Sequence, residues 1–507
     1  MATDLAEVIN RSLPYRPTSL KNLLLESARL HGDRTAVVAL HQSPRSILSP
    51  SANGEPSTYL RWTYAELLNR ARLLAAALQE HGVQRGDSIA SLVHNSADWA
   101  LCFWAAALLG CPWIAIQPRT ATNSAELTHI LDLSKPKVIL AGDDEQVEQL
   151  HVSAQPSIDT IGVRISINPG SVPLTGWKSL ASLMAQPSSE LKIVADDPTA
   201  IQDDLALVLF TSGTTGQAKG CIHTHKTVTN MFRNHASSLG LDETSSSVSH
   251  LTLAHCFGML YSVSFWSAGG KVVYPNCAFD PTSTLDALRR EQCTYMPAVP
   301  SVLHALLDAA SQTDTTAFSL RHIEFSGAMI SAEVIGQAKQ HLGASVVSAH
   351  YGMTESGPAA SWPYEEIPND VDGNFVSPGL PVAGGKLRIC APDSHVPLQR
   401  GQAGEIHQSS PHVISGYLGG ASSDQFYEDD SGRWMLTGDQ GIMLASGEVR
   451  VSGRYKDIII RGGENIAPAQ IEAVLNRHEH ITVRILSITI VETQANKVAG
   501  PSSRRSR

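Results

Sequence analysis

The segment with the clearest chemical potential is Leu207–Gly220, where an apolar run leads into glycines, hydroxyl side chains and one lysine. Glycines let successive backbone N–H groups turn inward around an anion, hydroxyls donate further hydrogen bonds, and the lysine adds a positive charge. The spacing does not fit the G-x-x-x-x-G-K-[ST] pattern. The alternative is a Gly/Ser-rich surface loop. We predict a polyphosphate-binding loop with these residues: Thr211, Ser212, Gly213, Thr214, Thr215, Gly216, Lys219 and Gly220.

Two further segments carry a carboxylate among turn-forming residues. In Tyr351–Gly357, the Thr354–Glu355 pair follows a strand-like run, where it can place a hydroxyl on a phosphate and a carboxylate on Mg²⁺. In Leu436–Gly441, a turn presents Asp439, which can accept both hydroxyls of a ribose. Each motif alone has an ordinary alternative, a helix start for the first and a simple turn for the second.

The fourth segment is Gly453–Glu472, which reads GRYKDIIIRGGENIAPAQIE. The four segments in this order resemble the signature set of the adenylate-forming superfamily, which includes acyl-CoA synthetases, 4-coumarate:CoA ligases, luciferases and adenylation domains. The resemblance extends from about Leu20 to Glu472. It implies that ATP converts a carboxylate into an acyl-adenylate with AMP as its leaving group, after which a thiol, usually that of CoA, attacks. The cofactors implied are ATP, Mg²⁺ and CoA.

The resemblance also implies roles for single residues. Catalysis would involve Lys219, Thr354, Glu355 and Arg454, with Glu355 holding the metal. Asp439 and Arg454 would hold the ribose. Lys456 falls at the position of the hinge between domains. The residues around the adenine and the α-phosphate would be Ser326, Gly327, Ala328, Tyr351, Gly352, Met353 and Thr354.

Three residues bear on the acid. The resemblance places His255 and Phe257 in the acyl pocket, and His350 stands where coumarate ligases have a glycine. The larger His350 favours a short- or medium-chain or an aromatic acid. Amino-acid-activating domains carry an aspartate in the region of His255, and none is present here. Because a buried ammonium without a counter-ion is costly, we expect a carboxylic acid other than an α-amino acid.

The C-terminal segment departs from the family pattern. The resemblance implies a mobile C-terminal domain with a P-K-T-x-S-G-K-like lysine, but the only lysine after Gly462 is Lys497, in N-K-V-A-G. We therefore expect 454–507 to be a truncated domain with an atypical tail at 481–507. Three hypotheses follow: an acid:CoA ligase, a pseudoenzyme or truncated gene product that binds nucleotide or acyl group, and a stand-alone adenylation enzyme that loads a carrier protein.

The composition of the chain limits the kinds of binding partner that we expect. The chain has 38 Lys and Arg against 48 Asp and Glu, a net charge of −10, so nucleic acid is not an expected partner. Seven scattered cysteines without a C-x-x-C pair indicate free thiols. Cys221, His223 and His225 alternate, as three zinc ligands on one strand face would, but no fourth ligand is evident. We expect a cytoplasmic protein, or a peroxisomal one if the natural C-terminus is missing, since the present terminus is not S-K-L.

The elements that must position these residues are helices alternating with short apolar strands. Thr63 and Glu66 form a capping box before a helix that ends at Gly82. The uncharged run Trp99–Ile116 contains a Gly-Cys-Pro break, which predicts a buried helix and a buried strand without a transmembrane segment. The class is α/β, with helix-covered, mostly parallel sheets. We predict an AMP-binding domain at 1–453, with a surface loop at 43–58 and a β-rich subdomain at 386–453.

Overall fold

The structure of the chain is a computed structural model. It describes residues 5–10, 17–44, 58–168, 170, 174–185, 197, 199, 201–212, 217–311, 315, 317–368, 375–420, 423–457, 459–461, 464–466, 468 and 471. The predicted loop residues Gly213, Thr214, Thr215 and Gly216 lie outside the described residues, as do most of the 43–58 loop and the 481–507 tail.

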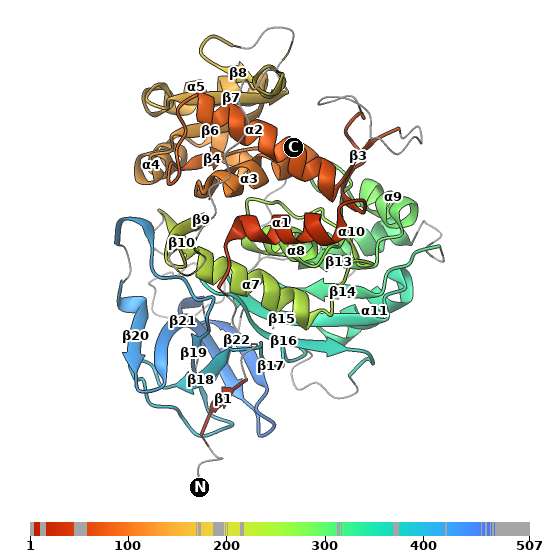
Figure 1. Cartoon of the computed structure of the whole chain (residues 1–507). Coiled ribbons are helices and arrows are strands. Elements are labelled where there is room, and N and C mark those ends of the chain that lie inside the picture. The colour runs from red at the N-terminus through yellow and green to blue at the C-terminus, as the bar shows by residue number, and fades with distance from the viewer. Residues whose placement is uncertain are drawn as a thin grey trace.

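The first sheet is mainly parallel and lies in the upper part of Figure 1. Its strands in spatial order are β10 (Ala218–Thr224), β9 (Leu205–Ser212), β5 (Trp113–Ala115), β4 (Ile89–Ser91), β6 (Val138–Asp143), β7 (Val163–Asn168) and β8 (Lys178–Ser179). Only the β9–β10 pair is antiparallel among these described strands, because a short hairpin joins it. The outer face is covered by α4 (Ser124–Ser134) and α5 (Asp144–Asp159), which share an apolar cluster with it.

The second sheet has a parallel centre and antiparallel edges. Its strands in spatial order are β17 (Leu380–Pro381), β16 (Gly357–Tyr364), β15 (Val346–Met353), β14 (His322–Phe325), β13 (Tyr295–Ala298), β11 (Ser246–Val248), β12 (Lys271–Tyr274), β2 (Thr35–Ala39) and β3 (Leu60–Thr63). One face packs on α9 (Pro281–Glu291), α10 (Pro300–Ala310) and α11 (Ala332–Leu342).

A layer of helices fills the space between the two sheets, as Figure 1 shows. These helices are α1 (Leu20–His31), α2 (Tyr64–Glu80), α3 (Ala97–Leu109), α7 (His225–Ser238) and α8 (Cys256–Ser267), with the short α6 (Leu180–Met184) beside α2. Helix α3 is apolar on every side and buried along its whole length, so the run Trp99–Ile116 forms the predicted buried helix and, in β5, the predicted buried strand. Among the described helices, none has both the length and the apolar character needed to cross a bilayer.

Helix α2 shows how local sequence sets an element. Thr63 caps it, because its hydroxyl accepts a hydrogen bond from the Glu66 backbone N–H at 3.2 Å while the Glu66 carboxylate accepts one from the Thr63 N–H at 2.8 Å. The helix ends at Glu80, and Gly82 follows with φ of +78°, a left-handed conformation that favours glycine. The predicted capping box is confirmed, and the predicted α/β class is confirmed with it.

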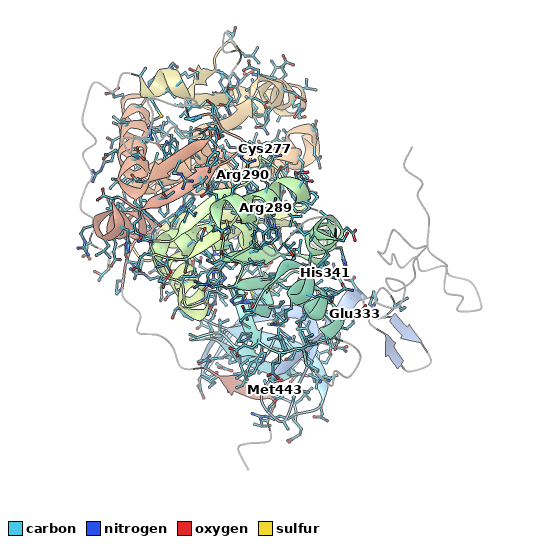
Figure 2. The ribbon with its side chains drawn as sticks, turned by 90° about the vertical axis from the view of Figure 1, so that its right-hand side faces the viewer. Cys277, Arg289, Arg290, Glu333, His341 and Met443 are labelled. Atoms are coloured by element: carbon cyan, nitrogen blue, oxygen red, sulfur yellow. The ribbon has the colours of Figure 1, made fainter. Side chains whose placement is uncertain are left out.

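The third sheet is antiparallel and forms the lower part of Figure 1. Its strands are β1 (Glu7–Ile9), β18 (Lys386–Cys390), β19 (Ala403–Ser409), β21 (Gly432–Met443) and β20 (Phe426–Asp429) in spatial order, with β22 (Val449–Arg454) also paired to β21. Figure 2 places Met443 of this sheet below Glu333 and His341 of α11. An apolar cluster that includes Ala359 and Ala360 of β16 joins it to the second sheet.

Single-turn helices and a small hairpin complete the described elements. The helical turns are η1 (Pro118–Thr122), η3 (Leu418–Gly420), η4 (Ser423–Gln425) and η5 (Tyr455–Asp457). The hairpin consists of β23 (Ile459–Arg461) and β24 (Glu464–Ile466). Strand β22 runs through Arg454, so the chain leaves the third sheet directly at the predicted hinge residue Lys456.

Candidate functional site

One cavity of about 740 Å³ brings together residues from all three sheets. The predicted site residues in its wall are Thr211, Lys219, His255, Phe257, Ser326, Gly327, His350, Tyr351, Gly352, Met353, Thr354, Glu355, Arg454 and Lys456. Segments more than 200 residues apart in the chain thus converge as the sequence motifs require. Of the site residues whose side chains the structure describes, Gly220, Ala328 and Asp439 are not part of this wall.

The phosphate-loop prediction falls on the β9–β10 hairpin. Thr211 and Lys219 are directly opposite each other in the antiparallel register, so both flank the base of the loop. Gly220 is tightly enclosed, because a Cβ there would lie 3.0 to 3.1 Å from side-chain atoms of Val208, Phe210 and Leu418. The hairpin therefore holds Lys219 at the cavity wall in fixed register.

Lys219 and Glu355 are linked by a residue that sequence reasoning missed, Tyr417. The Lys219 ammonium lies 5.4 Å from the centroid of the Tyr417 ring, a cation–π distance. The Tyr417 hydroxyl donates a hydrogen bond of 3.0 Å to Glu355 and also lies 2.7 Å from Gln425 Oε1. Burial, followed by the neighbouring Glu355 carboxylate, raises the pKa of Tyr417 far above its usual range, so the hydroxyl keeps its proton. The local sequence signal for Tyr417 was an aromatic residue directly after Gly416 in the predicted β-rich subdomain.

Thr354 and Glu355 follow β15 at its carboxyl end. Thr354 is buried, and the Glu355 carbonyl accepts a 2.8 Å hydrogen bond from the Ile414 N–H. His223 lies beside the Thr354 backbone, and burial lowers the pKa of His223 to about 4. A neutral imidazole therefore supports this turn and adds no charge to it.

The predicted ribose residues form a chain of polar contacts. Tyr351 donates a hydrogen bond of 2.7 Å to Asp439 Oδ2, and Arg454 Nε lies 2.9 Å from Asp439 Oδ1. Asp439 is opposite Arg454 in the β21–β22 register. Burial raises the pKa of Asp439, although the Arg454 guanidinium and the Tyr351 hydroxyl act against that change. Because Asp439 itself is set behind the cavity wall, Tyr351 and Arg454 are the members of this chain that face the cavity.

Backbone packing restricts which residues fit in the predicted adenine region. A Cβ on Gly352 would lie 2.3 Å from the Gly357 carbonyl oxygen, so only glycine fits where β15 and β16 approach each other. Gly327 has φ of +86°, and the Ser326 hydroxyl lies 3.4 Å from the His350 carbonyl oxygen, to which it donates. Ser326 and Gly327 therefore form a tight turn at the carboxyl end of β14, next to β15.

The predicted acid-pocket residues also line the cavity. His255 precedes α8 and caps it, because its Nδ1 accepts a 3.4 Å hydrogen bond from the Phe257 N–H. The Phe257 ring meets the Tyr261 ring edge-on at 6.1 Å. Sequence reasoning missed Glu324, a buried carboxylate in the same wall that lies 3.2 Å from His350 Nδ1. Its signal was a single acidic residue in the apolar run before Ser326.

The zinc hypothesis is wrong, because its three residues do not lie on one strand face. Cys221 and His223 lie on β10, but His225 is the first residue of α7, and its Nδ1 accepts a 3.2 Å hydrogen bond from the Leu20 N–H. Within the described part of the chain, no three His, Cys, Asp or Glu side chains are grouped to hold a metal ion. The chain turns into the helix at Thr224, which caps it, and this breaks the alternation on which the hypothesis rested.

A magnesium ion delivered with a nucleotide fits this donor set. Mg²⁺ usually keeps waters and substrate phosphates and takes only one or two carboxylates from the protein. Glu355 offers one carboxylate in the cavity wall, beside Thr354. The Tyr417 hydrogen bond fixes one of its oxygens and leaves the other for the ion.

Comparisons with known proteins show the family to which the chain belongs. Residues 24–418 match the AMP-binding enzyme family. An acyl-CoA ligase of Pestalotiopsis microspora is 26% identical over 479 residues, which cover 90% of this chain and 82% of that protein. An acyl-CoA ligase of Ajellomyces capsulatus is 29% identical over 440 residues, which cover 84% of this chain and 74% of that protein.

Solved structures of the same architecture include a ligase with nucleotide bound. O-succinylbenzoate coenzyme A synthetase of Bacillus subtilis, in complex with ATP and magnesium ion, matches with a TM-score of 0.73 and 25% identity, covering 91% of this chain and 85% of that one. ATP-bound MatB of Rhodopseudomonas palustris matches with a TM-score of 0.73 and 24% identity, covering 92% and 84%. The chain therefore belongs to the AMP-binding enzyme family, and the resemblance seen in its sequence is confirmed.

Proposed function

We propose that this chain is an AMP-forming acid:CoA ligase. The carboxylate oxygen of the acid attacks the α-phosphorus of ATP, pyrophosphate leaves, and an acyl-adenylate forms. The CoA sulfur then attacks the acyl carbon, the bond from that carbon to the AMP oxygen breaks, and the thiol proton is released. The family membership and the acyl-CoA ligase relatives support this class of reaction.

The observation that carries the proposal is the single cavity that contains both sets of residues. Lys219, Glu355 and Arg454 would face the nucleotide, and His255 and Phe257 would face the acid, within about 740 Å³. Such an enclosure holds two reactants in one orientation, which is the main requirement of phosphoryl-centred chemistry. The deep burial around Thr354 keeps water away from the reacting phosphorus.

Each side chain has a role that follows from its surroundings. Lys219 would neutralise charge on the phosphates, as its place beside Thr211 at the loop base supports. Glu355 and Thr354 would hold Mg²⁺ and the α-phosphate, and bound Mg²⁺ would supply further charge neutralisation. Tyr351 and Arg454, oriented by Asp439, would position the nucleoside.

For the acid, we propose a short- or medium-chain or aromatic carboxylic acid that is not an α-amino acid. His350 fills space in the cavity wall, which supports a limited chain length. Glu324 is the acidic group next to His350 in that wall, but it is already engaged by His235 and so is a poor counter-ion for a substrate ammonium. The cytoplasmic location predicted from the sequence stays a prediction.

The test is product formation by the purified 507-residue chain with Mg-ATP, CoA and pooled acids, measured by mass spectrometry. A new CoA thioester together with AMP would support the ligase and identify its acid. Acyl-adenylate without thioester would instead favour delivery to a carrier protein. Bound ATP with neither product would favour the pseudoenzyme. Lys219→Ala serves as the negative control and Lys226→Ala as the matched exposed-lysine control.

A further inference from the structure

A second group of polar side chains lines the cavity, apart from the predicted nucleotide residues. Glu324 on β14 and His350 on the neighbouring parallel strand β15 both face the cavity wall. Their side chains are only 1% and 3% exposed. Sheet interiors of this kind are normally apolar, so two polar side chains here need a reason.

His235 of α7 contacts both oxygens of the buried carboxylate. Its Nε2 lies 2.8 Å and 3.0 Å from the two Glu324 oxygens, and its Nδ1 lies 3.0 Å from Ser264 Oγ. Burial alone would raise the pKa of Glu324, but His235 and then His350 lower it to about 2. Glu324 therefore stays a carboxylate that is held in place by His235.

Two polar atoms beside this pair make no hydrogen bond to a described residue. His350 Nδ1 lies 3.2 Å from Glu324 Oε1, but the approach is not that of a hydrogen bond. The Tyr261 hydroxyl is fully buried and also makes no hydrogen bond to a described atom. The Tyr261 ring lies 5.8 Å from His235 and 6.1 Å from Phe257, which connects this polar group to the predicted acid pocket.

The Nε2 atom of His350 already has hydrogen-bond partners. Its Nε2 lies 3.1 Å from Ser348 Oγ and 3.0 Å from Ser361 Oγ, which fix the ring. The Nδ1 atom is therefore held in one direction, 3.2 Å from Glu324 Oε1 and without a hydrogen bond to a described residue. A buried polar group without a hydrogen bond is destabilising, so a bound group that supplies one is favoured.

We propose that Glu324 and His350 form a polar subsite that selects acids carrying a hydroxyl group on the acyl chain over plain alkyl acids of the same length. This inference rests on the proposed function, because it assigns the acyl end of the same cavity. A hydroxyl has one proton to donate to the Glu324 carboxylate and lone pairs to accept from His350. One such group therefore satisfies atoms of opposite hydrogen-bonding character at once.

Other substituents fit the subsite less well. An ammonium would be buried beside a carboxylate whose two oxygens are already engaged by His235, and a second carboxylate would be repelled by Glu324. An alkyl chain would leave the polar atoms without partners. A site built to hydrogen-bond a substrate hydroxyl rejects the analogue that lacks it.

The test compares straight-chain acids of four to eight carbons with their monohydroxylated analogues, as kcat/KM for thioester formation. We expect at least one hydroxylated acid to exceed its alkyl counterpart by about tenfold or more, consistent with the loss of one buried hydrogen bond. In His350→Gln and in Glu324→Gln this ratio should fall at least about fivefold. His341→Gln and Glu333→Gln, on α11 and outside the cavity wall, are the matched controls (Figure 2).

A binding measurement keeps the subsite testable without turnover and if one variant does not fold. The shift of Tm by each acid in the presence of AMP is measured for the wild type and for whichever of His350→Gln and Glu324→Gln folds. Thioester formation without any preference for hydroxylated acids would overturn the subsite and leave the ligase intact. A His350-dependent shift without thioester would support the subsite and overturn the ligase. Equal shifts by both kinds of acid, without thioester, would overturn both.

Discussion

The Tyr351 hydroxyl donates a 2.7 Å hydrogen bond to Asp439 and so joins β15 of the second sheet to β21 of the third. Asp439 in turn pairs with Arg454, which is two residues before the predicted hinge residue Lys456. A contact within the predicted nucleotide region is thus also a contact between two sheets. The orientation of Arg454 therefore depends on a hydroxyl that lies in another part of the fold.

Tyr351→Phe should raise KM for ATP about five- to tenfold, equivalent to the roughly 1 kcal/mol of one net hydrogen bond. The ring stays in place, but Asp439 loses its donor and no longer holds Arg454 in one direction. Steady-state kinetics with varied ATP measure the change. Tyr364→Phe is the control, because Tyr364 donates a similar 2.7 Å bond to the Ser377 carbonyl away from the cavity. Equal KM values in both variants would contradict the role of Tyr351.

Lys219→Ala should lower the rate of acyl-adenylate formation about 10²- to 10³-fold while Tm changes little, since charge stabilisation by a fixed group contributes on this scale. The residue is at the surface of a cavity and its removal leaves no packing defect. Pyrophosphate release in single turnover measures the rate. Lys226→Ala removes an exposed lysine seven residues further along the chain and should leave the rate unchanged. A large fall in Tm with an unchanged rate would show that Lys219 is structural.

Tyr417→Phe should raise the magnesium concentration needed for half-maximal activity several-fold, because the hydroxyl that orients Glu355 is removed while the carboxylate remains. The loss of one hydrogen-bond donor is worth about 1 kcal/mol. A magnesium titration at saturating ATP measures the effect. Tyr427→Phe, on β20 and bonded to His407, should titrate like the wild type. If both variants match the wild type, Tyr417 does not act through Glu355.

Acid should destabilise the fold between about pH 6.5 and pH 4. Burial is the first cause that lowers the pKa of His223, His250, His322 and His412 to about 4. Below pH 6.5 the unfolded chain binds protons that the folded chain excludes, so unfolding is favoured as pH falls. For one such histidine the loss is on the order of 2 kcal/mol at pH 5.

Thermal unfolding across this pH range measures the effect. In His412→Gln the amide can still donate toward the Pro358 carbonyl, which His412 Nε2 contacts at 3.0 Å, but it cannot titrate. This variant should therefore lose less Tm between pH 7 and pH 5 than the wild type. His341→Gln, on the surface helix α11, should keep the wild-type slope. An identical slope in all three proteins would contradict the prediction for His412.

Local sequence patterns predicted much of the fold. The capping box at Thr63 predicted α2, and the Gly-Cys-Pro break predicted that α3 gives way to a buried strand. The ordered motifs also named many residues that come together in the cavity wall, while their roles toward a nucleotide stay a prediction. Tyr417 and Glu324 were missed because neither belongs to a motif with a meaning of its own. Their contacts with Glu355 and His235 arise only when distant strands pack together.

The N-terminal strand β1 is another feature that local sequence could not predict, because its pairing partner is distant in the chain. Glu7 pairs in register with Arg388, 381 residues further along the chain, and no periodicity near residue 7 indicates this partner. Arg388 has a side chain that is 4% exposed and an Nε 3.0 Å from Glu7. It also binds Asp429 at 2.7 Å and stacks 3.5 Å over the Trp434 ring. One side chain thus attaches β1 to the third sheet.

Arg388→Lys should therefore be destabilising, although it keeps the charge. The planar guanidinium meets two carboxylates and a ring at once, which a single ammonium cannot do. We expect a loss of about 2–3 kcal/mol in unfolding free energy, the scale of a broken buried ionic contact. Arg400→Lys is the control, because Arg400 is exposed and also touches the N-terminal segment, at the Leu5 carbonyl. Since Arg388 is not in the cavity wall, activity per folded molecule should stay unchanged, and a fall in activity without a fall in stability would refute this account.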